Sequence, residues 1–132
     1  EIPRVNSKKA GDGRLILVVD DDPSILEVEK EILEESGFKV VTAVDGAIAL
    51  EVFKENAGVI CAVITDITMP NLDGIGAIRM IRKIKPEIPV IGSSGLLIEK
   101  QSEELREISL NAFLEKPFSA SAFMEAVYSL DI

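Results

Sequence analysis

Acidic residues that could bind a metal ion or a phosphoryl group follow two apolar runs of the chain. Asp20 and Asp21 follow the run 15–19, and Asp66 follows the run 59–64 with one intervening threonine. Carboxylates held close together repel one another, which raises their pKa values. A hard divalent cation such as Mg²⁺ removes this repulsion, because it takes oxygen ligands and two or three carboxylates suffice. The three aspartates are therefore candidate magnesium ligands.

Two further polar residues, Lys116 and Ser94, follow other apolar runs and extend this set. Lys116 offers a compact positive charge, and Ser94 offers a hydroxyl donor. A carboxylate beside a metal ion, an ammonium group and a hydroxyl group makes a site for a phosphoryl group. Carboxylates can also act as nucleophiles toward phosphorus and form aspartyl phosphates. We therefore expect phosphoryl chemistry at Asp66.

Strand-like and helix-like segments that position these residues alternate five times along the chain. This alternation predicts an α/β fold with one doubly wound, five-stranded parallel sheet that is covered on both faces. In the flavodoxin-like strand order 2-1-3-4-5, the first and third strands are neighbours, which brings the three aspartates together at the switch point. The expected strands span 15–19, 38–44, 59–64, 90–91 and 112–115, and the expected helices begin near 22, 46, 74, 98 and 119.

Local sequence signals predict where helices begin and which faces are buried. Asp22 before Pro23 is a typical N-cap, and the continuous apolar run 59–64 indicates a strand buried on both faces. Gly92, which has no side chain, is expected to leave a gap in the packing of the fourth strand. The predicted buried stripe of the first helix consists of Ile25, Val28, Ile32 and Leu33.

Length and composition indicate one soluble domain. The chain has 132 residues, is 47% hydrophobic and 28% charged, and carries a net charge of −9, which argues against direct binding of nucleic acid. No apolar stretch approaches the ~20 residues of a membrane span, so no membrane insertion is expected. The single cysteine, Cys61, is typical of a reducing compartment, which predicts a cytoplasmic domain. Residues 1–13 are predicted to be a linker or a disordered arm, and residues 14–132 the folded domain.

Four motifs that follow the expected strands occur in a fixed order along the chain: Val18-Val19-Asp20-Asp21, Asp66-Ile67-Thr68-Met69-Pro70-Asn71-Leu72-Asp73-Gly74, Ser94-Gly95 and Lys116-Pro117-Phe118. Together they resemble the receiver domain of bacterial two-component response regulators, over about Leu15 to Leu130. The resemblance implies that Asp66 is the phosphoacceptor, charged from a phosphohistidine of a histidine kinase or a histidine phosphotransfer protein. It also implies that Mg²⁺ is held by the aspartates and the backbone carbonyl of Thr68.

The same resemblance implies how a phosphoryl group is detected. Ser94 would bind the phosphoryl group, and Lys116 would pair with its oxygens, next to a cis bond to Pro117. Phe113 matches the aromatic switch position, where tyrosine is frequent, and Ser109 stands at a helix end where the family often has glycine. The fourth helix, the fifth strand and the fifth helix would form the output surface and a candidate homodimer contact.

Other functions are compatible with parts of the pattern. An aspartate-nucleophile phosphatase of the haloacid dehalogenase type would use the segment Asp20 to Ser24. That class also needs an acidic pair after its lysine, and the sequence after Lys116 supplies no close pair. A flavin-binding electron carrier shares the strand order, but no phosphate loop rich in serine and threonine follows the first strand. An inactive interaction domain would lack one of Asp21, Asp66 or Lys116, and all three are present. No turnover is expected beyond phosphotransfer and autodephosphorylation of the domain itself.

The ends of the chain favour an origin in a larger protein. The chain begins with Glu1 rather than methionine, and 1–13 has the composition of an interdomain linker. No output domain follows Ile132, and the stretch 93–96 resembles receivers attached to kinases. We therefore expect the receiver of a hybrid histidine kinase, whose parent protein could be anchored in a membrane, with a stand-alone response regulator as the alternative.

Overall fold

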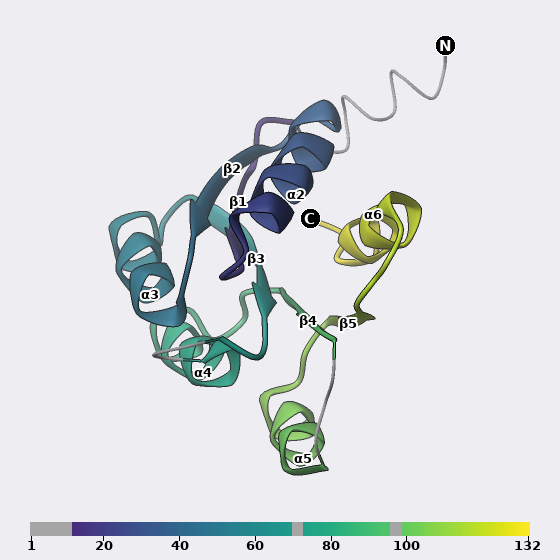
Figure 1. Cartoon of the computed structure of the whole chain (residues 1–132). Coiled ribbons are helices and arrows are strands. Elements are labelled where there is room, and N and C mark those ends of the chain that lie inside the picture. Colours follow the sequence, from purple (N-terminus) through teal and green to yellow (C-terminus); the bar gives the residue numbers. More distant parts are fainter. Residues whose placement is uncertain (1–11, 70–72, 96–98) are drawn as a thin grey trace.

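A parallel sheet of five strands organises the chain (Figure 1). The computed structural model describes residues 12–69, 73–95 and 99–132. The strand order is β2-β1-β3-β4-β5, and every neighbouring pair is parallel, so the predicted sheet and its order are confirmed. The strands are β1 (Leu15–Val19), β2 (Lys39–Ala43), β3 (Ile60–Asp66), β4 (Val90–Ser94) and β5 (Ala112–Glu115).

Helices cover both faces of the sheet, as the alternating pattern predicts. In Figure 1, α2 and α6 lie on one side of the strands, and α3, α4 and α5 lie on the other. Two separate apolar clusters fill the spaces between these layers and the sheet. The helices are α2 (Pro23–Glu35), α3 (Gly46–Glu55), α4 (Gly74–Ile84), α5 (Glu99–Ile108) and α6 (Ala120–Ser129).

Short polar side chains fix the first turns of four helices. Asp22 accepts a hydrogen bond from the Ser24 N–H at 2.9 Å and thereby caps α2, as expected. Equivalent caps at α3, α4 and α6 are made by Asp45, Asp73 and Ser119. Each cap satisfies a backbone donor that has no partner within its helix. The position where each helix leaves the sheet edge is therefore set locally by the sequence.

The central strand β3 is buried on both faces, except at its predicted start. Val59 is 63% exposed and precedes the strand, so its prediction as a buried strand residue is wrong. The Val59 N–H instead donates to the Asn56 carbonyl in the turn after α3. At its other end β3 continues to Asp66, which is its last residue. The carboxylate therefore stands at the carboxyl end of the most central strand.

Helix α2 presents a different face to the sheet than its apolar residues predict. Val28 is 55% exposed, whereas Leu26, Glu29 and Leu33 are buried. These three residues are spaced by three and four positions, which places them on one side of a helix. The prediction of Val28 as a core residue is therefore wrong, and a glutamate occupies the middle of the buried stripe.

Gly92 does not leave a gap in the sheet. A β-carbon built on Gly92 would lie 2.8 Å from Leu110 Cδ1 and 3.0 Å from Ile67 Cδ1, so these side chains already fill the space. The prediction of a packing gap at Gly92 is therefore wrong. The glycine is needed because its neighbours come so close.

One arginine joins α4 to the segment that leads into β5. The guanidinium of Arg82 donates to four oxygen acceptors at the end of α5 or just before β4 and β5, and it therefore holds these segments together. Ser109, beside this arginine, adopts a positive φ of 55°, which glycine accommodates more easily. The acceptors are the carbonyls of Ile108, Ser109 and Ile88 and the side-chain oxygen of Asn111.

Some predictions concern segments outside the described residues. Most of the predicted arm at 1–13, the Pro70 to Leu72 part of the loop after β3, and the predicted helix start near 98 lie there. None of the helices within 12–69, 73–95 and 99–132 has the length and apolar character that a membrane span requires.

Candidate functional site

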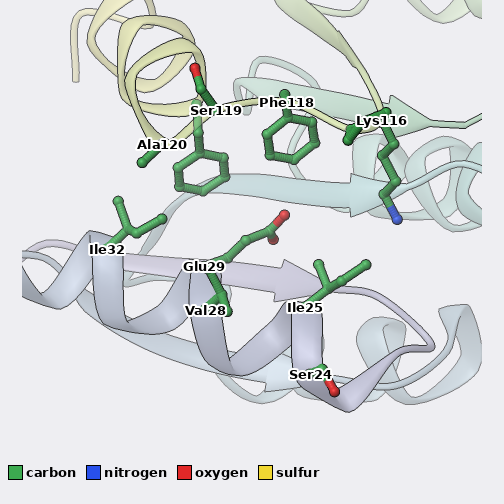
Figure 2. A pocket seen from close by; sticks show the side chains of 11 residues that line it. Ser24, Ile25, Val28, Glu29, Ile32, Lys116, Phe118, Ser119 and Ala120 are labelled. Atoms are coloured by element: carbon green, nitrogen blue, oxygen red, sulfur yellow. The ribbon is translucent and has the colours of Figure 1, made fainter.

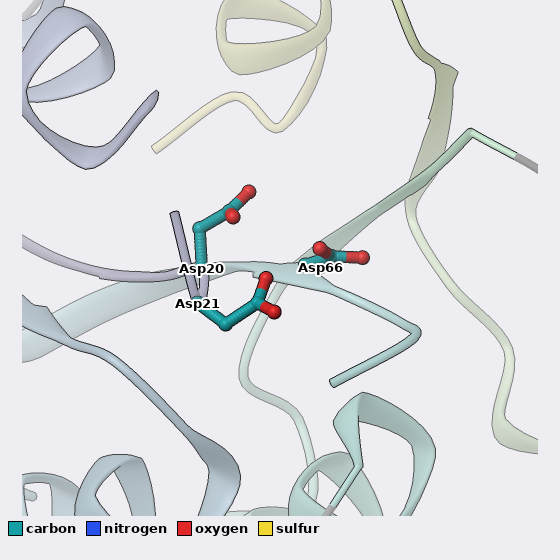
Figure 3. Close-up of side chains that lie close together, drawn as sticks. All are labelled: Asp20, Asp21 and Asp66. Atoms are coloured by element: carbon teal, nitrogen blue, oxygen red, sulfur yellow. The ribbon is translucent and has the colours of Figure 1, made fainter. Parts of the chain in front are cut away.

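Three carboxyl groups meet at the carboxyl edge of the sheet, where β1 and β3 end side by side. Figure 3 shows Asp20 and Asp21 after β1 and Asp66 at the end of β3. One oxygen from each carboxyl group lies within 4.8 Å of the other two. The strand order 2-1-3-4-5 makes this possible, because it pairs β1 directly with β3. The predicted meeting of the three aspartates is therefore observed.

Asp20 is the most deeply buried of these acids, and its two oxygens have different partners. Its Oδ1 accepts the Asp22 N–H at 3.0 Å, and its Oδ2 accepts the Lys116 ammonium at 2.7 Å. Burial raises the pKa of Asp20, and its hydrogen bonds to Lys116 and Asp22 offset this only in part. The carboxylate is thus held in a fixed orientation at the bottom of the site.

Asp66 is buried but turned toward the same lysine. Its Oδ1 accepts the Thr68 N–H at 3.1 Å, and its Oδ2 accepts the Lys116 ammonium at 3.2 Å. The Thr68 side chain itself is exposed. The bend after β3 therefore directs the Thr68 N–H toward the Asp66 carboxylate and the Thr68 side chain toward solvent.

Lys116 bridges the two strand ends, because its ammonium group bonds both Asp20 and Asp66. Burial alone would lower the pKa of Lys116, but the hydrogen bond and charge of Asp20, together with Asp66, raise it overall. The Lys116–Pro117 bond is cis, as the resemblance implies. Lys116 therefore remains a cation next to the acids.

Ser94 and Phe113 lie on the neighbouring strands at different levels. Ser94 is the buried last residue of β4, one position beyond Ser93, which pairs with Asp66. Its carbonyl accepts the Lys116 N–H at 2.9 Å, so Ser94 adjoins the lysine segment. Phe113 in β5 is 36% exposed and therefore faces outward.

Glu29 is an acidic neighbour of the site that the sequence analysis did not single out. Its side chain is only 4% exposed, and burial raises its pKa to about 7, with repulsion from Asp20 and Asp66 adding to the shift and Lys116 opposing it. The spacing of Glu29 from Leu26 and Leu33 was a signal of its burial. Its approach to the site depends on how α2 packs, which the sequence does not specify.

The backbone of Asp66 is in direct contact with the start of α4. A β-carbon on Gly74 would lie 2.1 Å from the Asp66 carbonyl oxygen and 2.7 Å from Ile67 Cα. The Gly74 N–H donates to the Ile67 carbonyl at 3.0 Å, which fixes this close approach. Only glycine fits here, so α4 sets the position of the backbone that carries Asp66.

We expect Gly74→Ala to destabilise the fold by at least about 1–3 kcal/mol, because the methyl group must displace backbone atoms. The matched control is Gly58→Ala, where nothing lies within 4 Å of the added carbon. The control should change stability by less than about 0.5 kcal/mol. Urea denaturation of both variants measures the difference, and equal midpoints would contradict the close approach.

Comparison with known proteins identifies the family. The family model described as the response regulator receiver domain matches residues 16–128. The chain belongs to this family. Its sheet order and its acidic cluster agree with this membership. The alternative of a haloacid dehalogenase-type phosphatase is therefore not favoured. This receiver domain is therefore a signalling module of two-component systems.

Relatives of this receiver domain differ in their overall organisation. The chemotaxis protein CheY of Bacillus subtilis is 35% identical over 113 residues, which are 85% of this chain and 92% of CheY. The sensor histidine kinase RcsC of Salmonella typhi is 33% identical over 122 residues, which are 91% of this chain but 13% of RcsC. The chain thus spans nearly all of one relative and a small part of the other.

Solved structures of receiver domains match the fold closely. A receiver domain protein from Clostridium thermocellum is 34% identical with a TM-score of 0.82, covering 89% of this chain and 94% of its own. The receiver domain of sensor histidine kinase PA1611 from Pseudomonas aeruginosa is 25% identical, with a TM-score of 0.79 and coverages of 91% and 99%. That structure holds a magnesium ion coordinated in its active-site cleft.

Proposed function

We propose that this receiver domain accepts a phosphoryl group on Asp66 from a phosphohistidine and changes conformation to pass on the signal. The observation that carries the proposal is the lysine bridge, in which the Lys116 ammonium bonds both Asp20 and Asp66. A carboxylate oxygen of Asp21 lies within 4.8 Å of an oxygen of each of these two aspartates. A buried carboxylate next to a fixed cation and further acids is suited to attack phosphorus and to hold the product.

The proposal gives each side chain a role that this geometry supports. An Asp66 oxygen attacks phosphorus, the new O–P bond forms, and the bond from phosphorus to the histidine nitrogen breaks. Lys116 exchanges its hydrogen bond to Asp66 for one to a phosphoryl oxygen. The hydroxyl group of Ser94, which adjoins the lysine segment, donates a hydrogen bond to a second phosphoryl oxygen.

Mg²⁺ would be held by the carboxylates of Asp20, Asp21 and Asp66 and by the Thr68 carbonyl, because clustered carboxylate and carbonyl oxygens suit a hard cation. When bound, the ion supplies positive charge that stabilises the transferring phosphoryl group. The bound magnesium in the PA1611 receiver supports this assignment.

Incubation with acetyl phosphate tests the proposal directly. We expect intact-mass spectrometry to show one added phosphoryl group per chain with Mg²⁺ and none with EDTA. The attached group should be stable in acid and labile in base, as acyl phosphates are. Catalytic release of phosphate from a generic phosphate ester, without a stable adduct, would instead indicate a phosphatase and refute the proposal.

Asp21→Asn is expected to weaken Mg²⁺ binding about 10-fold or more, because the variant removes one of the proposed anionic ligands. The half-saturating Mg²⁺ concentration for phosphorylation should rise by the same factor. Glu55→Gln, at the exposed last residue of α3, is the control. A magnesium titration that is identical for Asp21→Asn and the parent would show that the proposed ligand set is wrong.

Ser94→Ala should leave Asp66 able to be phosphorylated but should uncouple the change at Phe113. The variant removes the hydroxyl donor at the end of β4. In the parent, the bond from this donor to the phosphoryl group would draw β4 and its neighbour β5 into a second packing arrangement. Fluorine NMR of a labelled Phe113 ring reports this movement. If phosphorylation shifts the Phe113 signal equally in both proteins, the proposed link through Ser94 is refuted.

A histidine kinase or a histidine phosphotransfer protein is the proposed partner, and a hybrid kinase is the proposed parent. Both proposals are supported by the sensor kinase relatives RcsC and CqsS, in which the matching segment covers 13% and 18% of the whole. The domain is proposed to work in the cytoplasm, and the surface of α5, β5 and α6 to serve as output and homodimer contact. A reading frame that encodes kinase segments before Glu1 would agree with this origin, and a start codon next to Glu1 would contradict it.

A further inference from the structure

An open groove of about 580 Å³ lies between α2 and the segment that connects β5 to α6. Its walls are apolar: Ile25, Val28 and Ile32 come from α2, and Phe118 and Phe123 come from the opposite side. The two phenylalanine rings are stacked, with centroids 5.9 Å apart and an interplanar angle of 7°. Figure 2 shows these walls and the Lys116 side chain at one end of the groove.

Glu29 is the unexpected member of this groove. Figure 2 shows its carboxyl group rising from α2 into the groove, toward Phe118. The side chain is 4% exposed, no donor among the described residues is hydrogen-bonded to it, and its carboxyl oxygens keep their remaining contact with solvent. A carboxyl group in such apolar surroundings gains from a charged donor more than one in bulk water does, because little water competes for it. Glu29 therefore offers an unused acceptor at the bottom of an apolar groove.

The size and lining of the groove fit a small molecule. Ligand sites in proteins are concave, mostly apolar, about 300–1,000 Å³ in volume, and contain a few converging polar groups. This groove combines apolar walls with Glu29 and Lys116 as its charged groups. A ligand of this class needs a compact apolar or aromatic body that fits beside the Phe118 ring, because Phe123 behind it is fully buried.

Charge determines the polar group that the ligand should carry. Acids outnumber cations here: the carboxyl groups of Asp20, Asp21 and Asp66 lie within 4.8 Å of one another, and Lys116 already bonds two of them. Glu29 adds a fourth carboxyl group that interacts with Asp20, Asp66 and Lys116. The whole chain carries a charge of −9. An anionic ligand would meet repulsion from these acids, whereas an ammonium group would gain a charge-assisted hydrogen bond with Glu29.

We propose that the groove between α2 and α6 is a binding site for a small organic cation, in which an aromatic or aliphatic body packs between Phe118 and the apolar side chains of α2, and an ammonium group bonds Glu29. The groove ends at Lys116, so the ligand lies next to the side chain that bridges Asp20 and Asp66. The site is separate from the phosphoacceptor carboxylate, and its occupation does not depend on the function proposed for Asp66.

Backbone amide NMR of the whole chain tests the site with three probes of similar shape. These are 2-phenylethylamine, the neutral 2-phenylethanol and the anionic 3-phenylpropanoate. We expect the amine to shift amide signals of α2 and the start of α6, with a dissociation constant on the order of 1 mM, as befits a fragment of this size. At pH 8, where Glu29 is mostly ionised, the anion should bind at least about 10-fold more weakly, because Glu29 repels it.

Glu29→Gln is the decisive variant, and Glu31→Gln on the exposed side of α2 is its matched control. The first should weaken binding of the amine about 10-fold, the loss expected for a charge-assisted hydrogen bond, and leave binding of the neutral alcohol unchanged. The control should bind all three probes like the parent. Equal affinity of the amine for the parent and Glu29→Gln, equal affinity for amine and anion, or shifts confined to other elements would overturn the proposal. Phosphorylation by acetyl phosphate is measured separately, so failure of one proposal is distinguishable from failure of the other.

Discussion

Asp66→Asn is expected to abolish phosphorylation of this receiver domain by acetyl phosphate. The amide nitrogen and oxygen of asparagine are poor nucleophiles, and the variant lacks the negative charge that attacks phosphorus. We expect the rate to fall by at least about a thousandfold, below detection by intact-mass spectrometry. The fold should persist, because the amide oxygen can still accept a hydrogen bond from Thr68 or Lys116.

Asp22→Asn provides the matched control for this prediction. Asp22 is exposed and caps α2, a role that asparagine performs equally well. The control should be phosphorylated like the parent, although it also loses one carboxylate close to the site. Full phosphorylation of Asp66→Asn, or loss of phosphorylation in Asp22→Asn, would mean that another acid is the acceptor.

The change that Glu29→Gln makes to the free energy of unfolding should be more favourable at pH 8 than at pH 5. The pKa of Glu29 is about 7 in the folded chain and 4.5 in the unfolded chain. Between these values the folded state binds more protons than the unfolded state, so the stability of the parent falls as the pH rises from about 4.5 to 7. Through this group, the free energy of unfolding of the parent should be about 3 kcal/mol lower at pH 8 than at a pH below 4.5.

The variant does not titrate at this position, so it lacks this part of the pH dependence. The charged groups that act on Glu29 are Asp20, Asp66 and Lys116, and none of them is altered. Urea denaturation in EDTA from pH 5 to pH 8 gives the free energy of unfolding for the parent, Glu29→Gln and Glu31→Gln. Parallel pH profiles for the parent and Glu29→Gln would show that the Glu29 carboxyl group is not buried as described.

The sequence predicts the sheet and its chemical edge well because both depend on local patterns. Continuous apolar runs mark parallel strands that are buried on both faces, and short polar residues mark the helix starts. Once β1 and β3 are neighbours, Asp21 and Asp66 must meet at one edge. The acidic cluster follows from strand order alone, without detailed side-chain packing.

Features that depend on packing between elements were missed or wrong. The apolar character of Val28 suggested burial, but α2 buries Glu29 at the bottom of the groove and leaves Val28 largely exposed. Gly92 suggested a gap, but Leu110 comes from the loop before β5 to fill it. The rotation of a helix about its axis and the reach of a distant side chain depend on all the packed layers together, so a local pattern does not determine them.

Borohydride trapping of the phosphorylated chain tests the central claim most directly. Borohydride reduces an aspartyl phosphate to homoserine, and peptide mass spectrometry then identifies the residue that carried the phosphoryl group. After treatment with acetyl phosphate and Mg²⁺, we expect homoserine at position 66, and none in samples treated with EDTA. Homoserine at position 20 or 21, or none in a chain that carries a phosphoryl group, would contradict the assignment of Asp66 as the phosphoacceptor.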